Sequence, residues 1–395
     1  MRTVLTINAG SSSIRFAIFE ASQSPRRLLQ GKMERIGGDD ASLTVNQGVD
    51  GAPTAIQVKI KERGTAVGFL MDWLELQPLF KTLDGVGHRV VHGMLRTNPE
   101  RVTTELLDEL KSIIPFDPEH LPREIELIEA LLSRHGTLPQ VVCFDTAFHR
   151  TMPRVATQLP IPRRYAAQGI QRYGFHGLSY TFLMQELARL GDPAAAQGRV
   201  ILAHLGGGAS LAAVRDGRCV DTSMGFTPTA GLVMGTRSGD LDPGLMSYLA
   251  LTNAMTAMQF QTMVNHESGL LGISEVSADV RDLLDRESSD PRAAEALALF
   301  CYQTKKWIGS FAAALGGVDA LVFAGGIGEN AAPVRKRICD GLSFLGIDLD
   351  ENANNRHAPR ISSDRGSSVR VRVIRTDEES VIATLSIGLL GFAPT

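Results

Sequence analysis

The sequence lacks the features of a membrane, secreted or nucleic-acid-binding protein. Its 395 residues contain no apolar run near the ~18 residues that a membrane span requires. The N-terminal residues 1–8 read as a strand and lack a charged segment followed by an apolar core, so we see no signal peptide. A net charge of -3 without a basic run argues against nucleic acid as the main partner. We expect a cytoplasmic protein with neither membrane nor nucleic acid as its partner.

Cysteine is also scarce. The four cysteines stand far apart and form no C-x-x-C pair, and three of them lie in apolar runs or in a helical pattern. Spacing of this kind favours buried free thiols in a reducing compartment over disulfides or a metal site.

Two common nucleotide-binding motifs are missing. No G-x-x-x-x-G-K-[ST] occurs, which excludes a P-loop kinase. A Gly326-x-Gly328 pair follows a predicted strand, but Ala331 stands where G-x-G-x-x-G requires its last glycine. A dinucleotide-dependent dehydrogenase is therefore disfavoured.

What the sequence does contain is an alternation of short β-branched runs and longer helical patterns, which is typical of an α/β protein. Its length suggests about two domains. The strands predicted before and after the second copy of the repeat described next are Val4–Ile7, Ser13–Phe19, Val141–Asp145 and Ala320–Ala324, and the clearest helices are Glu124–Arg134 and Ala293–Leu315. The second helix is apolar on most faces, which predicts burial between layers.

One arrangement occurs twice. Near the N-terminus a strand, a turn of small residues and a second strand follow one another, and Arg199–Leu205, Gly206–Gly208 and Ala209–Arg215 repeat this order, with a third strand at Cys219–Thr222. Two copies half a chain apart suggest a duplicated α/β domain with a nucleotide cleft between the halves. The alternative is that strand–glycine–strand is a common hairpin.

Three turns of small residues could direct backbone N–H groups at phosphate oxygens: 8–13, 204–210 and 325–330. Glycine turns also serve chain geometry alone, so no single one identifies a phosphate site.

Four charged or polar residues stand in settings that suit a site. Arg89 and Arg237 lie between glycines, where a guanidinium suits an anion, although a surface salt bridge is the alternative. Asp145 ends a predicted buried strand, as site residues of α/β proteins do, but it could equally cap the next helix. His176 lies between glycines before a helical pattern, where a structural role is the alternative.

Together these segments resemble the acetate kinase family over essentially the whole chain. The matching motifs, in the family's order, are NAGSSSIRF (8–16), GHRVVHG (87–93), FDTAFH (144–149), RYGFHG (172–177), HLGGGASL (204–211), DTSMGFTPTAGLVMGTRSGDLDP (221–243), SGLLGIS–SADVRD (268–282), FAGGIGEN (323–330) and TDEE (376–379). The resemblance implies duplicated actin-like (ribonuclease H-like) domains flanking a nucleotide cleft. It also implies reversible transfer of the γ-phosphoryl group of ATP to a carboxylate, most simply acetate to acetyl phosphate.

The resemblance further implies residue roles. Asn8 and Glu378 would hold Mg²⁺, or Mn²⁺, as hard oxygen donors. The catalytic set would be Arg89, Asp145, His176 and Arg237. Arg89 would also bind the acid, whose methyl group would meet Val91, Phe175 and Pro228, for which core packing is the alternative. ATP or ADP would be bound by Ser11, Ser13, Arg15, His204, Gly206, Gly207, Gly208, Asp279, Arg281, Gly325, Gly326, Ile327, Gly328 and Asn330.

For the whole molecule the resemblance implies a homodimer. It places an acid-binding N-terminal domain at residues 1–149 plus 381–395 and a nucleotide-binding C-terminal domain at 150–380.

Several positions depart from the family's pattern. Gly207 replaces an asparagine that would donate to nucleotide phosphates, Tyr180 replaces a histidine, and Met94 breaks a double glycine. Glu119 stands where the family has a leucine near the acid's methyl group, and it either faces solvent or reshapes the pocket.

Three other functions stay open. One methylene changes preference by only about 1–3 kcal/mol, so the sequence leaves propionate open beside acetate. Butyrate kinases resemble this chain in the HLGGG turn, although the block 221–243 resembles acetate or propionate kinases. From another class, the fold could serve as an ATP-gated module without transfer chemistry. Such a module would not need Arg89, Asp145, His176 and Arg237 together, and all four are present.

Overall fold

The computed structural model describes residues 2–10, 13–34, 41–47, 54–57 and 63–392. By its internal contacts the chain divides into two compact units. The first unit comprises residues 1–147 together with 377–395, and the second comprises residues 148–376. The prediction of two domains with borders after residues 149 and 380 stays a prediction.

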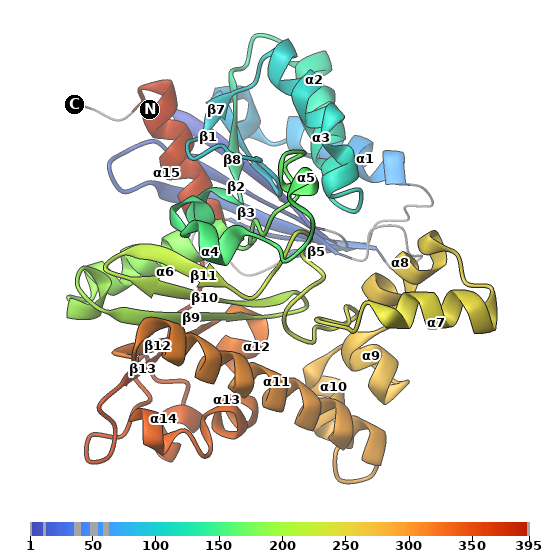
Figure 1. The fold of residues 1–395 in the computed structure, drawn as a ribbon. Helices are drawn as coiled ribbons and strands as arrows, with labels where there is room; N and C mark the ends of the chain where they lie inside the picture. Colours follow the sequence, from blue (N-terminus) through green and yellow to red (C-terminus); the bar gives the residue numbers. More distant parts are fainter. Residues whose placement is uncertain (1, 11–12, 35–40, 48–53, 58–62, 393–395) are drawn as a thin grey trace. The chain divides into compact units, whose positions relative to one another are not determined.

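The first unit is built on a mixed sheet whose described strands follow the order β5-β4-β3-β2-β1-β6-β8-β7 (Figure 1). Their bounds are β1 Thr3–Ala9, β2 Ser13–Glu20, β3 Arg26–Glu34, β4 Ser42–Gln47, β5 Thr54–Gln57, β6 Leu83–Val90, β7 Glu100–Arg101 and β8 Gln140–Phe144. β1 pairs antiparallel with β2 and parallel with β6, which in turn pairs parallel with β8. The carboxyl ends of β1, β6 and β8 therefore lie at one edge of the sheet.

Helices cover both faces of this sheet, and β1 is therefore buried along its whole length. Leu5 and Ile7 of β1 enter a core with α1 (Arg63–Glu75) and α3 (Leu121–Arg134), while Val4 enters a cluster with α15 (Glu378–Leu390). α15 lies so close to β6 that a methyl group at Gly87 would come within 2.2 Å of Ser386 Oγ, so glycine is required there. The remaining helical segments of this unit are η1 (Pro78–Thr82), α2 (Thr104–Ser112) and η2 (Ile114–Phe116).

The second unit repeats the central part of the first. Its described strands follow the order β11-β10-β9-β12-β13, with bounds β9 Arg199–Leu205, β10 Ala209–Arg215, β11 Arg218–Thr222, β12 Ala320–Ala324 and β13 Arg370–Val373. Two antiparallel pairs are followed by two parallel pairs, as in β3-β2-β1-β6-β8 of the first unit. The predicted α/β fold class is confirmed, and the shared strand order supports duplication over a chance hairpin.

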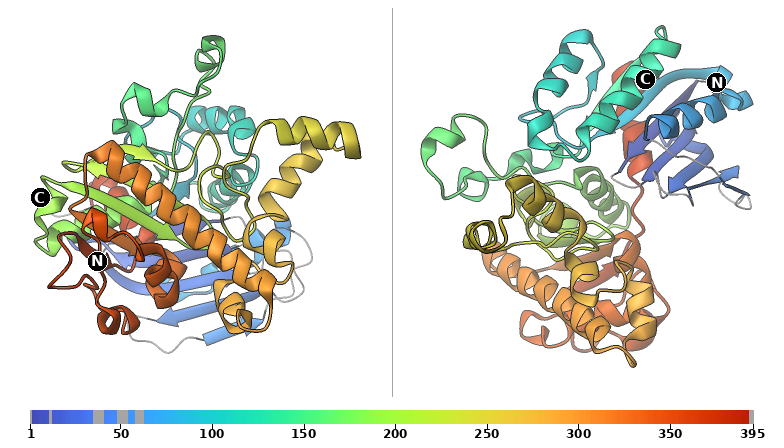
Figure 2. Two further views of the ribbon diagram at one scale, coloured as in Figure 1. Left: turned by 60° about the horizontal axis from the view of Figure 1, so that its bottom comes forward. Right: turned by 90° about the vertical axis from the view of Figure 1, so that its right-hand side faces the viewer.

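Helices also cover this second sheet. Tyr180 and Leu183 of α6 (Gly177–Arg189) pack on Val200 and Leu202 of β9. The long helix α11 (Pro291–Leu315), orange in Figure 2, lies along the sheet and contacts β9 and β10. The sequence predicted a helix buried between layers, but α11 is buried on one face only, and Tyr302 on its outer side is 59% exposed.

The other helical segments of the second unit are shorter. They are η3 (Ala147–Thr151), α4 (Arg154–Thr157), α5 (Arg163–Ala166), η4 (Pro193–Ala195), α7 (Gly244–Asn253), α8 (Ala257–His266), α9 (Gly269–Ser274), α10 (Val280–Arg286), α12 (Gly325–Asn330), α13 (Ala332–Cys339), η5 (Ser343–Leu345) and α14 (Glu351–Asn355). The segment 325–330, predicted as a turn, is thus the short helix α12, which packs against β9.

The structure bears on the predictions about cysteines and about membrane-spanning segments. All four cysteines are free and buried, as expected. Within the described part of the chain, none of the helices combines the length and the apolar composition that a membrane span requires.

Candidate active site

The first group of candidate residues centres on Arg89, near the carboxyl end of β6. Its side chain is 10% exposed, and its Nη2 donates to Oδ2 of Asp145 at 2.9 Å. Asp145 follows β8, the parallel neighbour of β6, which explains why residues 56 positions apart meet. Nη1 of Arg89 also donates to the backbone oxygen of Ala9 at 3.0 Å. Burial of both partners excludes the surface salt bridge as a description of Arg89.

A residue that the sequence analysis missed completes the surroundings of Arg89. Glu124 of α3 is 2% exposed, and its Oε1 accepts from Arg89 Nη1 at 3.1 Å. Its Oε2 accepts from the backbone N–H of Val91 at 2.9 Å. A signal was available, since Glu124 stands four and seven residues before the buried Ile128 and Leu131, on the apolar face of the helix.

Carboxylates and an amide gather where β1 ends and α15 begins. Nδ2 of Asn8 lies 2.7 Å from Glu378 Oε2 and 3.2 Å from Glu379 Oε1. Burial and the charge of Asp145 raise the pKa of Glu378, while Arg89 and Arg15 oppose that rise. Glu378 is therefore within electrostatic range of the Arg89–Asp145 pair.

This group fits a divalent cation. Mg²⁺ prefers oxygen donors and is usually held by one or two carboxylates together with waters and substrate phosphates. No cluster of three or more His, Cys, Asp or Glu side chains suited to a metal occurs among the described residues. Asn8 and Glu378 offer an amide and a carboxylate, and a cation would favour the ionised form of Glu378, whose pKa is raised by burial and by the charge of Asp145.

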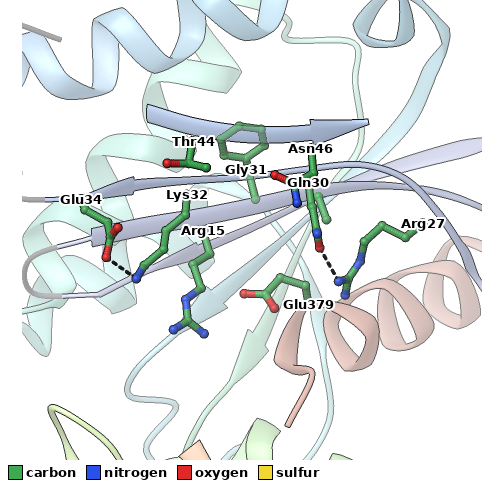
Figure 3. Close-up of a pocket in the computed structure, with 11 residues that line it drawn as sticks. Arg15, Arg27, Gln30, Gly31, Lys32, Glu34, Thr44, Asn46 and Glu379 are labelled. Atoms are coloured by element: carbon green, nitrogen blue, oxygen red, sulfur yellow. Dashed lines mark hydrogen bonds and ion pairs between the residues drawn. The ribbon is translucent and has the colours of Figure 1, made fainter. Parts of the chain in front are cut away.

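A pocket of about 340 Å³ opens on the polar face of the same sheet (Figure 3). Arg15 on β2 stands opposite Lys32 on β3, and Lys32 stands opposite Thr44 on β4, so these side chains share one face. In Figure 3, Arg15 and Glu379 reach toward each other below the strands. Of the predicted nucleotide residues, Arg15 lines this pocket, Ser13 begins β2, and Ser11 lies outside the described residues.

In the second unit, His176 occupies a restrained position before α6. Its φ of 60° is left-handed, which is uncommon for a residue other than glycine and is often found at functional sites. Its Nδ1 lies 2.8 Å from Ser210 Oγ, and its ring stacks on His204 at a centroid distance of 4.3 Å. His204 Nδ1 in turn lies 2.8 Å from Ser179 Oγ. His176 is thus held by a network of polar groups.

The glycine turn between β9 and β10 brings His176 and Arg237 together. A methyl group at Gly208 would lie 3.3 Å from His176 Nε2 and 3.8 Å from Arg237 Nη1. Gly235 N donates to Gly207 O at 3.1 Å, which ties the arginine's loop to the turn. Arg237 Nη1 donates to the backbone oxygen of Pro228 at 3.2 Å.

The start of α12 borders the same turn. A methyl group at Gly206 would lie 3.8 Å from Gly326 N. Gly325 has a φ of 76°, and a methyl group there would come within 2.7 Å of Leu205 O, so only glycine fits. Gly328 and Ile327 lie on this helix, and Asn330 Nδ2 donates back to Gly326 O at 2.9 Å.

The remaining predicted residues are less closely grouped. Asp279 caps α10 and pairs with Arg281, whose side chain is 86% exposed. Ala278, next to Asp279, lies beside Gly235, whose loop contacts the glycine turn. Phe175 and Pro228 are buried in the second unit, and Val91 is buried in the first. Glu119 lies in the segment between η2 and α3, and Tyr180 OH contacts Ser210.

The sequence and the fold both match known proteins. The sequence model of the acetokinase family matches residues 3–384. An acetate kinase of Rhodopseudomonas palustris is 44% identical over 390 residues, or 96% of each chain. A propionate kinase of Citrobacter rodentium is 43% identical over 388 residues, which cover 96% of this chain and 95% of that protein.

Solved structures agree. The crystal structure of Porphyromonas gingivalis acetate kinase has a TM-score of 0.86 at 34% identity and covers 99% of this chain and 100% of that one. A propionate kinase from Francisella tularensis has a TM-score of 0.90 at 34% identity, covering 98% and 100%. With a family match over nearly its full length, the chain belongs to the acetokinase family and is a phosphotransferase that acts on the carboxylate of a short-chain acid.

Proposed function

We propose that this chain is an acetate kinase: it transfers the γ-phosphoryl group of ATP to acetate, reversibly, to give acetyl phosphate and ADP. The observation that carries the proposal is the buried Arg89–Asp145 pair at the carboxyl edge of β6 and β8, with Asn8 and Glu378 within electrostatic range. A buried guanidinium held in one orientation suits a carboxylate, and the neighbouring oxygen donors suit a metal–nucleotide complex.

The proposed chemistry needs little from the protein except position and charge. An oxygen of the ionised acid attacks the γ-phosphorus, and the bond from that phosphorus to the β,γ-bridging oxygen breaks, which leaves ADP. Because the acid is already deprotonated, no strong general base is required. Arg89 and Arg237 stabilise the acid and the phosphoryl group, Asp145 orients Arg89, and His176 donates to a phosphoryl oxygen.

Asn8 and Glu378 would hold the metal, directly or through water. A bound Mg²⁺ or Mn²⁺ would neutralise phosphate charge. Residues 206–208, with His204, Ser11, Ser13 and Arg15, would contact the phosphates. Asp279, Arg281, Asn330 and residues 325–328 would line the nucleoside site.

For the small acid, Val91, Phe175 and Pro228 would form the wall that meets the methyl group. The same reading keeps the homodimer, the cytoplasmic location and the two domains as part of this proposal. Propionate is the alternative substrate, favoured by the 43% identity to a propionate kinase. Butyrate and a non-catalytic ATP-gated module are further outcomes of the test below.

The function is tested by trapping acyl phosphate as the hydroxamate with ATP, Mg²⁺ and acids from formate to butyrate. We expect kcat/KM to be highest with acetate. A maximum at propionate or butyrate would replace the substrate while keeping the reaction. Absence of turnover with every acid, alongside measurable ATP binding, would favour the ATP-gated module.

Gly207 offers a second test on the nucleotide side. A Cβ atom at this position would meet no other atom within 4 Å, so Gly207→Asn places its side chain at an open point of the turn. The added amide should donate one hydrogen bond to a phosphate, worth about 1 kcal/mol, and lower the KM for ATP about fivefold. Steady-state kinetics with Gly207→Ala as control separates the effect of the added amide donor from the effect of replacing glycine. Equal KM values for both variants would contradict a phosphate contact at this turn.

A further inference from the structure

Glu124 has no role in the proposed reaction, yet its carboxyl group accepts a hydrogen bond from Arg89, the residue proposed to bind the acid. A guanidinium has five N–H donors, and two of them belong to Nη1. In Arg89 these two donate to Glu124 Oε1 at 3.1 Å and to Ala9 O at 3.0 Å. A carboxylate that uses both Nη1 and Nη2 of Arg89 must therefore displace Glu124 or share with it.

The same carboxyl group also contacts the backbone of Val91, a residue predicted to meet the acid's methyl group. Glu124 Oε2 accepts from Val91 N at 2.9 Å. Both oxygens of Glu124 thus face N–H donors, an arrangement that the ionised form satisfies fully. In that form Arg89 is paired with two carboxylates, Asp145 and Glu124, and the three side chains carry a net charge of about -1, which opposes a further anion.

We propose that Glu124 is a positioning residue that regulates acid affinity through its own proton: ionised, it competes with the acid for Arg89, and neutral, it yields Arg89 to the acid. The inference rests on the proposed role of Arg89 in binding the acid's carboxylate. Acid binding to the ionised form would accordingly be accompanied by uptake of one proton onto a Glu124 oxygen.

The surroundings of Glu124 place the gain and loss of its proton near physiological pH. Burial raises the pKa of Glu124 to about 8, although Arg89 and the Val91 N–H favour the ionised form. Asp117, in the segment before α3, and Asp145, after β8, add to the rise. Asp117 itself lies 2.9 Å from His120 Nδ1, so this side of the helix carries further titratable groups that a control must separate.

The sign of the pH effect follows. As the pH rises through about 8, the ionised form of Glu124 replaces the neutral form and competes with the acid for Arg89. As the pH falls below about 8, the neutral form predominates and this competition fades. We expect the KM for the acid to rise about tenfold between pH 7 and pH 9, while the KM for ATP changes little. In Glu124→Gln, which cannot ionise, the KM for the acid should be nearly independent of pH across this range.

Glu129→Gln, on the exposed side of the same helix, is the matched control and should keep the wild-type profile. Isothermal titration of acetate at pH 8, in two buffers of different ionisation enthalpy, measures proton uptake without any variant. Uptake of part of a proton is expected in the wild type.

A wild-type slope that persists in Glu124→Gln, or binding without proton uptake, would overturn the role of Glu124 while leaving the kinase assignment intact. Absence of turnover with any acid would instead overturn the proposed function. In that case the calorimetric measurement still decides whether acid binding takes up a proton.

Discussion

Replacing Arg237 by alanine is expected to slow phosphoryl transfer by about 10³–10⁵, equivalent to roughly 4–7 kcal/mol of transition-state stabilisation. Arg237 Nη1 would lie only 3.8 Å from a methyl group at Gly208, so its charge is directed at the turn proposed to hold the phosphates. The loop that carries Arg237 is held to this turn by the backbone hydrogen bond from Gly235 N to Gly207 O, which does not need the arginine side chain. ATP affinity should therefore change little, which fluorescence or calorimetric titration can measure.

Arg218→Ala provides the control for Arg237→Ala. Arg218 is an exposed arginine on β11 of the same unit, and its replacement should leave kcat within about twofold of the wild type, as surface changes usually do. If Arg237→Ala keeps normal turnover, Arg237 does not stabilise the phosphoryl group. If both variants lose activity equally, the loss reflects folding, and thermal unfolding of each variant would show it.

Replacing Glu378 by glutamine is expected to raise the Mg²⁺ concentration for half-maximal activity by about 10–100-fold, a loss typical of disturbed metal sites. Glutamine keeps the size of the side chain but removes the charge that Asn8 and its neighbours hold at the end of β1. Mn²⁺ binding followed by electron paramagnetic resonance in the presence of ADP gives a measurement that does not depend on turnover.

Glu379→Gln separates the two adjacent carboxylates. Arg15 acts on both carboxyl groups, but Glu378 also senses the charges of Asp145 and Arg89, whereas Glu379 lines the pocket of Figure 3. We expect Glu379→Gln to change the metal requirement much less. The reverse order of effects would place the metal on the polar face of β2 and β3, beside Arg15.

Local patterns predicted the central strands well. The bounds of β9, β10 and β12 agree with the sequence prediction, because each strand is a β-branched or apolar run closed by glycine or a charged residue. α3 was also predicted from its period, apart from its first three residues, Leu121–Arg123. The order of the strands was not predicted, since pairing between distant strands leaves no mark in a single sequence.

The site was predicted unevenly for a physical reason. Asp145 ends a predicted strand, so the rule about carboxyl ends applied to it, and Arg89 was selected because glycines flank it. Glu124 acts from a helix whose pattern reads as amphipathic, and only the fold shows that its buried face reaches Arg89. The helical form of 325–330 was missed because glycine is unfavourable within helices, a preference that packing against β9 overrides here.

The position of α15 has a consequence for biosynthesis. The helix belongs to the first unit, where Ala383 and Ile387 pack with Val4 of β1, yet it is made after the whole of the second unit. During translation, one apolar face of the N-terminal sheet therefore stays uncovered while the more than 200 residues of the second unit are synthesised. Only when α15 leaves the ribosome can this face close, and the same event delivers Glu378 to Asn8. Folding of the first unit and assembly of its proposed metal site would thus finish in one late step, before which the nascent chain exposes a surface suited to chaperones.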